Sequence, residues 1–179
     1  MRDSAINNGQ PGKQDLLIRD VCPGELDAVS LMLKEAFKEY KSSFPPEVWQ
    51  SYLENIMDVH SRLNTAQLII AKLNMQVVGT VTLYLDALRS SQEGWPPGWA
   101  SIRLLAIHPA YRGRGIGRAL MEECIHRCRK QNIKTIGLHT AKIMSVACKL
   151  YESMGFVRRP EYDFHPRPGT VVMTYALQL

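Results

Sequence analysis

The chain has 179 residues, of which 45% are hydrophobic and 22% charged, and its formal net charge is +5 at pH 7. This size and balance are ordinary for one globular domain with a buried core. No apolar run approaches the roughly 18 residues of a membrane-spanning helix, and residues 1–15 lack the apolar stretch of a signal peptide, so we expect a cytoplasmic protein without membrane contact.

The first predicted boundary falls near residue 15. Residues 1–15 are polar and contain Asn-Asn-Gly and Pro-Gly, which favours a flexible N-terminal tail ahead of a single domain over 16–179. Within that domain, apolar runs predict strands at 16–19, 67–73, 77–85, 99–107, 135–140, from 156, and at 170–177. Helical spacing of apolar residues predicts helices at 25–40, from 46, at 115–131 and at 145–154. Loops are expected at 86–98 and 158–169, which are rich in Gly, Pro or Ser.

This order of elements is β-α-α-β-β-β-α-β-α-β-β. The order therefore predicts a mixed α/β (α+β) fold around a largely antiparallel sheet.

The four cysteines are expected to be reduced thiols, since no secretion signal is present. Cys124, His126 and Cys128 have a spacing that could suggest a metal site. However, Cys124 and Cys128 continue the helical stripe of Ile116 and Leu120, while His126 lies off it. We therefore expect buried core thiols and no bound metal.

The most informative stretch is Arg103–Glu123, where an apolar run ends at Pro109, a basic glycine-rich loop follows, and a helix begins. Glycines let the backbone approach a ligand closely, and the start of a helix carries free N–H groups that suit an anion. Between Arg103 and Lys134 there are eight Lys/Arg residues against two acids, so the rest of the chain carries −1. This local excess favours a bound phosphate or diphosphate over nucleic acid, which usually contacts a broad basic face.

Two familiar phosphate loops do not fit this stretch. A P-loop requires Gly-Lys-Ser/Thr, which is absent from the chain. A dinucleotide-binding fingerprint requires a third glycine and an acidic residue about 20 positions later. Here Ala119 and Leu120 follow Gly117, and no acid lies between Glu123 and Glu152.

Two motifs in this region resemble the GNAT superfamily of acetyl-CoA-dependent N-acetyltransferases. The first is Leu105-Ala106-Ile107-His108-Pro109 followed by Arg112-x-x-Gly115-x-Gly117, and the second is Ala147-x-x-Leu150-Tyr151-x-x-x-Gly155-Phe156. The resemblance implies an enzyme, an N-acetyltransferase that uses acetyl-CoA as co-substrate and no metal. It also implies a sheet of about seven strands with about four helices, splayed between the fourth and fifth strands to admit the pantetheine arm.

The resemblance also implies roles for particular residues. The cofactor would be bound, mainly through backbone groups, by Leu105, Ala106, Ile107, Arg112, Gly113, Arg114, Gly115, Ile116, Gly117 and Arg118. Tyr151 matches the family tyrosine that can protonate the departing thiolate as general acid.

The general base is not identified by the motifs. Some relatives carry a glutamate at the position of Ser101, and an asparagine at that of Met144, where one cofactor hydrogen bond is therefore in question. The remaining candidates for the base are His139, on the expected strand 135–140, His108, Glu93, and a chain of ordered water.

The resemblance implies a primary amine of a small molecule or a protein as the acceptor. It places the acceptor pocket near the first two helices, the loop between the third and fourth strands, and the last strands. Tyr40, Phe44, Tyr84 and Trp99 are the candidate lining residues, with Trp49, Trp95 and Tyr162 nearby, although Trp49, Tyr84 and Trp99 are also explained by ordinary core packing. The chain would act as a monomer or homodimer. The alternative function is a non-catalytic acyl-CoA-binding or sensing domain of the same fold.

Overall fold

A computed structural model describes residues 16–90, 94–167 and 169–179 of the chain, and the expected tail at 1–15 lies outside these residues. The strands are β1 (Leu17–Asp20), β2 (Gln67–Leu73), β3 (Gln76–Tyr84), β4 (Ala100–Ile107), β5 (Thr135–Thr140), β6 (Val157–Arg158), β7 (Phe164–Arg167) and β8 (Thr170–Gln178). The α-helices are α1 (Leu26–Phe37), α2 (Pro46–Met57), α3 (Val59–Arg62), α4 (Ile116–Lys130) and α5 (Ser145–Ser153). Short 3-10 turns include η1 (Pro23–Glu25), η2 (Lys38–Ser43), η3 (Ala87–Arg89), η4 (Pro109–Tyr111) and η5 (Pro160–Tyr162).

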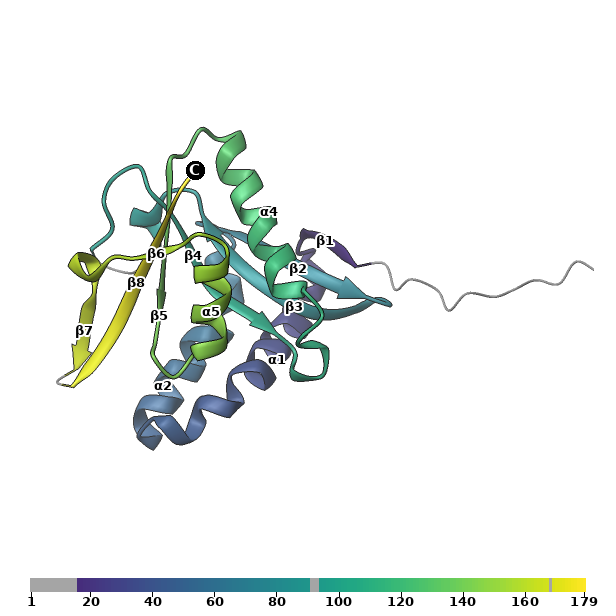
Figure 1. The fold of residues 1–179 in the computed structure, drawn as a ribbon. Coiled ribbons are helices and arrows are strands. Elements are labelled where there is room, and N and C mark those ends of the chain that lie inside the picture. The colour runs from purple at the N-terminus through teal and green to yellow at the C-terminus, as the bar shows by residue number, and fades with distance from the viewer. Residues whose placement is uncertain (1–15, 91–93, 168) are drawn as a thin grey trace, which may run out of the picture.

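The strands form one sheet in the order β1-β2-β3-β4-β5-β8-β6, and β7 pairs with β8 beside this path (Figure 1). Every pairing is antiparallel except that of β4 with β5, so the predicted mixed, mostly antiparallel fold is confirmed.

The sheet has eight strands rather than about seven, because β7 lies inside the stretch 158–169 that was expected to be a loop. Its prolines hide the strand pattern, yet Pro166 is acceptable because β7 pairs on one side only, with β8. The short helix α3 was not expected either. With it, the described residues form five α-helices rather than about four.

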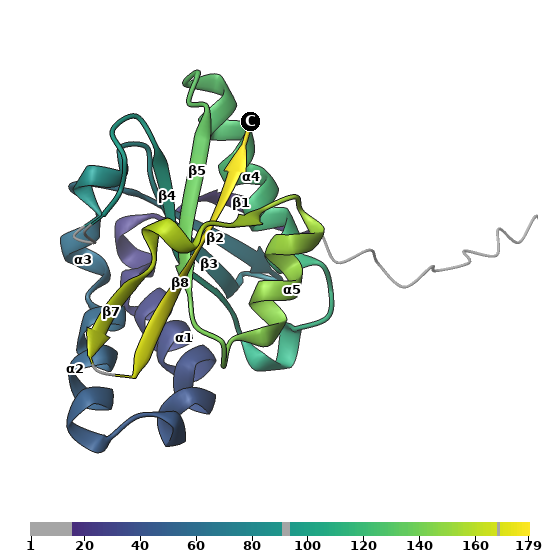
Figure 2. The same cartoon turned by 60° about the vertical axis from the view of Figure 1, so that its left-hand side comes forward.

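Helices cover both faces of the sheet, with α1 and α2 on one and α4 and α5 on the other (Figure 2). Alternation along β2 explains this arrangement, because side chains point to opposite faces at every second residue. Leu68 and Ile70 join the core beneath α1–α3, while Ile69 and Ala71 join the core beneath α4.

Helix α4 buries the apolar stripe that its sequence predicts. Cys124 and Cys128 are both part of the core, as expected, and burial raises the pKa of Cys128 to about 11 and that of Cys124 further. Both thiols therefore stay protonated at neutral pH. His126 is exposed on the outer side of the helix.

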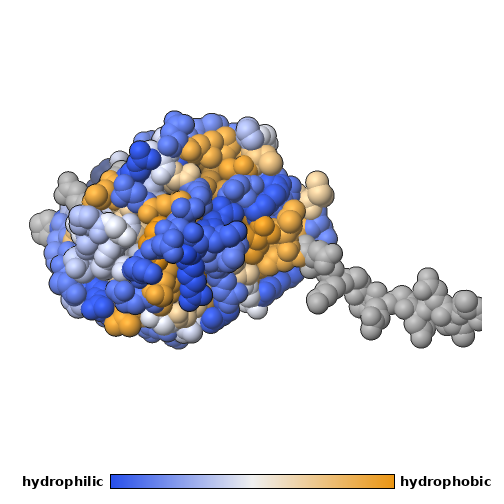
Figure 3. All heavy atoms as spheres, turned by 90° about the horizontal axis from the view of Figure 1, so that it is seen from above, coloured by the Kyte–Doolittle hydropathy of each residue, from blue (hydrophilic) through white to orange (hydrophobic). Residues whose placement is uncertain are grey.

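Seen from above the view of Figure 1, the surface is largely hydrophilic, with smaller hydrophobic areas between the polar ones (Figure 3). No helix in the described ranges is long and apolar enough to cross a membrane.

The two central strands, β4 and β5, are paired over only a short part of their length. The parallel pairing of β4 with β5 covers three residue pairs and ends at Ile102 and Leu138, after which the strands diverge. On its other side, β4 shifts register against β3 between Thr80 and Thr82. Leu104, at this irregularity, has φ +51°, a left-handed conformation that is uncommon for leucine. The splay that the family resemblance implied is therefore present, with a bulge in the strand that forms one wall.

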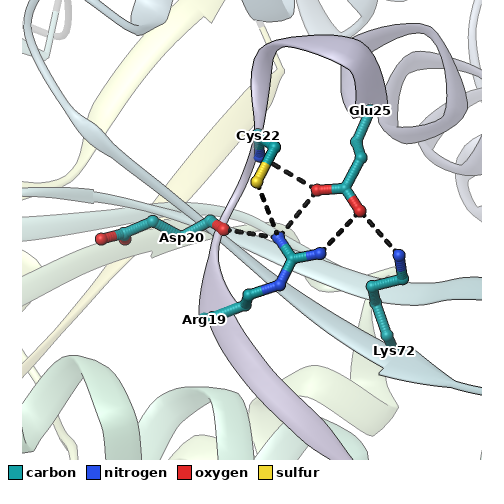
Figure 4. A network of polar contacts seen from close by, with 5 residues as sticks. All are labelled: Arg19, Asp20, Cys22, Glu25 and Lys72. Atoms are coloured by element: carbon teal, nitrogen blue, oxygen red, sulfur yellow. Dashed lines mark hydrogen bonds and ion pairs between the residues drawn. The ribbon is translucent and has the colours of Figure 1, made fainter. Parts of the chain in front are cut away.

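A charged network fastens β1 to β2 and to the turn before α1 (Figure 4). The Glu25 carboxylate accepts two hydrogen bonds from the Arg19 guanidinium, both 2.7 Å, and one from Lys72 Nζ, also 2.7 Å. It also accepts the Cys22 backbone N–H at 2.9 Å. The bonds from Arg19 and then Lys72 hold the pKa of Glu25 far below its usual range. The carboxylate is thus stabilised in its charged form by the folded state.

We expect Glu25→Gln to lower the free energy of unfolding by about 1–2 kcal/mol at pH 7, because the variant leaves two cations facing a neutral amide. A folded-state pKa below the unfolded value of about 4.3 means that this stabilisation is present above that pH and is lost as pH falls below it. Urea unfolding at pH 7 and pH 3 measures both effects. Glu35→Gln is the matched control, because Glu35 reaches Lys38 only at 3.9 Å on the exposed side of α1. An equal effect of Glu25→Gln at both pH values would contradict this account.

Candidate functional site

A cleft of about 930 Å³ opens where β4 and β5 diverge. One end is formed by the last residues of β4, the loop before α4, and α5. The other end is formed by η2, α2 and the hairpin of β7 and β8. The cleft therefore runs through the sheet, from the start of α4 to the aromatic residues around α2.

The strand β4 lines the middle of the cleft from Ile102 to Ile107. On one side it is bonded to β3 as far as the pair Gly79 and Ile107. On the other side its pairing to β5 stops at Ile102, so the backbone of residues 103–107 presents an edge to the cleft. Such an edge can hydrogen-bond an extended ligand that carries amide groups.

The loop that follows β4 has the geometry of an anion site. Gly113 and Gly115 have φ values of +75° and +77°, and a Cβ built on either glycine meets no atom within 4 Å. The first hydrogen bond of α4 runs from the Ala119 N–H to the Gly115 carbonyl at 3.0 Å, so the amides of residues 116–118 precede it. The start of α4 is thus an open cradle lined by amide groups.

The arginines of this loop make protein contacts as well. Arg112 donates to the carbonyls of Ile107 at 3.2 Å and Ala36 at 2.9 Å, and pairs with Glu39 at 2.9 Å. Its guanidinium therefore ties α1 and η2 to the end of β4.

The other two arginines contact neighbouring helices and turns. Arg114 lies over the Tyr111 ring at 5.2 Å, and Arg118 donates to Ser153 Oγ at 2.7 Å. Both keep positive charge beside the start of α4.

Tyr151 stands on α5 and lines the cleft, although its side chain is 6% exposed. Its hydroxyl makes no hydrogen bond within the described ranges, and its ring packs beside Phe156 with centroids 5.9 Å apart. Burial raises the pKa of the phenol well above its usual value. The group is therefore a protonated, uncommitted O–H donor in the cleft.

His139, near the end of β5, also lines the cleft. Its ring stacks on Trp95 at 4.2 Å and meets Phe164 edge-on at 4.9 Å. Burial lowers its pKa to about 4, so the imidazole is neutral at neutral pH. Both ring nitrogens are buried, and neither reaches a hydrogen-bond partner among the described residues.

The other positions considered for the base lie elsewhere. His108 accepts the Ala110 N–H at 3.3 Å and is not among the residues that line the cleft. Glu93 lies outside the described residues. Ser101 is fully buried, and its hydroxyl has no partner in the described part of the chain. Met144 precedes α5 and lines the cleft with a thioether, at the position where the family resemblance implied an asparagine.

Aromatic side chains form the end of the cleft beyond β4. Tyr40 and Phe44 line it as expected, together with Tyr52 and Phe164, which the sequence did not single out. Phe44 stacks on Tyr52 at 5.3 Å. By contrast, Tyr84 is 2% exposed within the sheet, and Trp99 packs on Tyr162 at 5.2 Å; neither lines the cleft.

The charges along the cleft favour an anionic ligand. Among the described lining residues, Glu39 is the carboxylate and it pairs with Arg112. The lining arginines are Arg103, Arg112, Arg118 and Arg167. Arg103 donates to the Ser90 carbonyl at 2.9 Å, and Arg118 lies at the start of α4.

Comparisons with known proteins agree on one family. A profile described as the acetyltransferase (GNAT) family matches residues 31–156. The spore coat polysaccharide biosynthesis protein SpsD of Bacillus subtilis is 26% identical over 156 residues, which is 82% of this chain and 49% of that protein. The [ribosomal protein bS18]-alanine N-acetyltransferase of Escherichia coli K12 is 36% identical over 67 residues, 35% of this chain and 45% of that protein.

A solved structure shares the fold along nearly the whole chain. The PaiA N-acetyltransferase of Thermoplasma acidophilum, in complex with coenzyme A, superposes with a TM-score of 0.73 at 18% identity, covering 92% of this chain and 99% of that one. The chain spans half or less of the length of the curated relatives named above.

Proposed function

The chain belongs to the acetyltransferase (GNAT) family, and on that premise we propose that it transfers the acetyl group of acetyl-CoA to a primary amine in the cleft between β4 and β5. One observation carries the proposal: a single cleft contains an open strand edge, an amide-lined helix start and the protonated phenol of Tyr151. These are the parts that thioester aminolysis needs for holding the donor and protonating its sulfur.

The residues fit the co-substrate at both of its polar parts. The amides at the start of α4, with the loop from Arg112 to Arg118, would hold the diphosphate. The open edge of β4 at Leu105, Ala106 and Ile107 would bond the pantetheine amides and orient the thioester carbonyl. Coenzyme A is bound in the Thermoplasma relative, which supports this assignment.

The chemistry divides between two side chains. Bound acetyl-CoA supplies the thioester; the amine nitrogen forms a bond to the acetyl carbon, and the bond from that carbon to sulfur breaks. The Tyr151 hydroxyl donates its proton to the departing sulfur. His139, neutral in the structure, is the proposed acceptor of the proton released by the amine, and its ring must turn to bring one of its two buried nitrogens into the cleft. The apolar aromatic wall assists, because desolvation lowers the pKa of an ammonium group and favours the free amine.

The acceptor is proposed only as a primary amine. A protein N-terminus is one source, since the Escherichia coli relative is named for acetylation of a ribosomal protein alanine. A small molecule is the other, since the Bacillus relative is named for polysaccharide biosynthesis. A panel of amines scored by CoA thiol release separates the two. The proposal includes a cytoplasmic location and a monomer or homodimer.

A second candidate is a non-catalytic acyl-CoA-binding domain. It is favoured by Ser101, a buried serine at the position where some relatives have a glutamate. Acyl-CoA binding without thiol release across the amine panel would establish this alternative.

Acetyl-CoA is expected to stabilise the folded chain. At a concentration one hundred times its Kd, acetyl-CoA should raise the free energy of unfolding by about 2.7 kcal/mol, because the ligand binds the folded state alone. Differential scanning fluorimetry with and without acetyl-CoA measures it as a rise in Tm. Desulfo-CoA should give a similar rise, since the diphosphate and pantetheine contacts are retained, whereas adenosine should not. No rise with any acyl-CoA would remove both candidate functions.

A further inference from the structure

The ring of Tyr52 is held in place on the face of α2 that lines the far end of the cleft. It stacks on Phe44 with centroids 5.3 Å apart and 21° between the planes, and it meets Phe37 edge-on at 6.1 Å and 76°. Its hydroxyl makes no hydrogen bond among the described residues and, unlike the ring nitrogens of His139, is not fully buried. Burial of the phenol raises its pKa to about 12, so it stays protonated. Helix α2 therefore presents a fixed O–H donor that a ligand in the cleft can reach.

Arg103 of β4 and Asn55 of α2 line the same end of the cleft. Asn55 follows Tyr52 by three residues, which places both side chains on one face of the helix. Oδ1 of Asn55 lies 3.5 Å from Nη2 of Arg103, so the amide oxygen faces the guanidinium and the amide NH₂ group points away from it. Arg103 also donates to the Ser90 carbonyl at 2.9 Å, and its charge is close enough to Tyr52 to oppose the rise of the phenol pKa. The three side chains thus form one polar group at the edge of the aromatic wall.

This polar group has the chemistry of an anion site. It offers the cleft N–H and O–H groups, and one of its members carries a full positive charge. Arg167 on β7 adds a second cation to this end of the cleft. Among the described lining residues the carboxylate is that of Glu39, and it is paired with Arg112 beside the loop before α4. Donors with positive charge complement a carboxylate, whereas they repel a second ammonium group.

We propose that Tyr52, Arg103 and Asn55 bind a carboxylate of the acceptor, so that the substrate is a small amino acid rather than a polyamine or a peptide N-terminus. The proposal rests on the proposed function, in which the β4 backbone from Leu105 onward orients the thioester. Arg103 precedes Leu105 by two residues, a spacing of roughly 6–7 Å along a strand. A carboxylate held near Arg103 therefore leaves an amine only a few bonds away close to the acetyl carbon.

A panel of matched acceptors tests the carboxylate directly. It pairs the standard α-amino acids, β-alanine and γ-aminobutyrate with their carboxamides, and includes spermidine and a peptide with a free N-terminus. We expect at least one free acid to exceed its carboxamide about tenfold or more in kcat/KM, because the amide lacks the charge that the donors bind. In the α-amino acid pairs the carboxamide also lowers the pKa of the amine, so intrinsic reactivity would favour the amide instead.

The outcomes of the panel separate the proposal from the function on which it rests. Carboxamides, spermidine or the peptide acetylated as fast as every free acid would overturn the carboxylate site and leave the acetyltransferase in place. If no amine of the panel is acetylated, the proposed transfer itself fails, which is a separate outcome.

Tyr52→Phe keeps the stacked ring and removes only the hydroxyl. We expect it to raise KM for the preferred acid about tenfold, with KM for acetyl-CoA and kcat/KM for the matching carboxamide unchanged. Arg103→Gln should raise the same KM about thirtyfold or more, since the lost hydrogen bond is charge-assisted. Tyr175→Phe is the matched control, because its hydroxyl is bonded to Glu152 at 2.9 Å and it does not line the cleft.

The comparison of acid with carboxamide decides between a binding role and a general structural one. A structural effect of Tyr52→Phe would change both acceptors alike, and that result would also overturn the proposal. Circular dichroism and urea unfolding identify any variant that does not fold. Arg103→Gln carries that risk because the guanidinium holds the Ser90 carbonyl, in which case Tyr52→Phe supplies the decision alone.

Discussion

Replacing Tyr151 by phenylalanine is expected to lower kcat about 100-fold, while KM for acetyl-CoA stays near its wild-type value. The phenol is buried on α5, lines the cleft and makes no hydrogen bond to the described residues, so its proton is available to the leaving sulfur. Its raised pKa keeps it protonated across neutral and mildly alkaline pH. Phenylalanine preserves the ring and its packing on Phe156, and removes only the donor.

The steady-state rate of thiol release at saturating acetyl-CoA measures this effect. Tyr175→Phe is the control, because Tyr175 is equally buried and its hydroxyl donates to Glu152 at 2.9 Å, away from the residues that line the cleft. That variant should retain kcat. An unchanged kcat in Tyr151→Phe would reassign proton donation to water or to another group.

Replacing Gly115 by aspartate is expected to raise KM for acetyl-CoA by about 30- to 100-fold. A carboxylate at the start of α4 repels a diphosphate a few Å away by about 2–3 kcal/mol at an intermediate dielectric constant. The N–H groups at this helix end attract any anion, so the added carboxylate competes with the diphosphate for them. The position has room, since a Cβ there meets nothing within 4 Å.

Gly115→Asn is the matched control. Asparagine and aspartate have the same shape and tolerate a φ of +77° about equally, so the two variants differ in charge alone. Urea unfolding should give the two variants similar free energies of unfolding, whereas their KM values for acetyl-CoA should differ. Equal KM values in the two variants would place the diphosphate away from the start of α4.

The elements of the fold were largely predictable because their signals are local. The strand at Gln67–Leu73 and the helix that begins at Pro46 follow from apolar spacing and from a proline at a helix start. The strand Phe164–Arg167 could not be predicted, because the three prolines of the stretch 158–169 indicate a loop and because its pairing depends on β8. The bulge at Leu104 was also unpredictable, since leucine gives no local reason for a positive φ.

The residues of the candidate site also fall into those that have a local sequence signal and those that have none. Gly113 and Gly115 stood out in the sequence because glycine allows a close backbone approach, and both have a positive φ in the structure. The side chain of Arg112 was not placed by sequence, because its partner Glu39 lies 73 residues away. Tyr52 resembled a core residue, since nothing in a helical stripe distinguishes a cleft wall from a core, and Phe164 lies in a stretch that was expected to be a loop.

The divergence of β4 from β5 places a free strand edge inside the molecule rather than at the rim of the sheet. A free edge at the rim is a hazard, because it can pair with a strand of another protein and begin aggregation. Here α5 and the β7–β8 hairpin flank the edge, and the aromatic residues of η2 and α2 close its far end. A narrow flexible ligand can reach it, whereas a neighbouring sheet cannot, so the fold keeps a strand ready for pairing without exposing it to self-association.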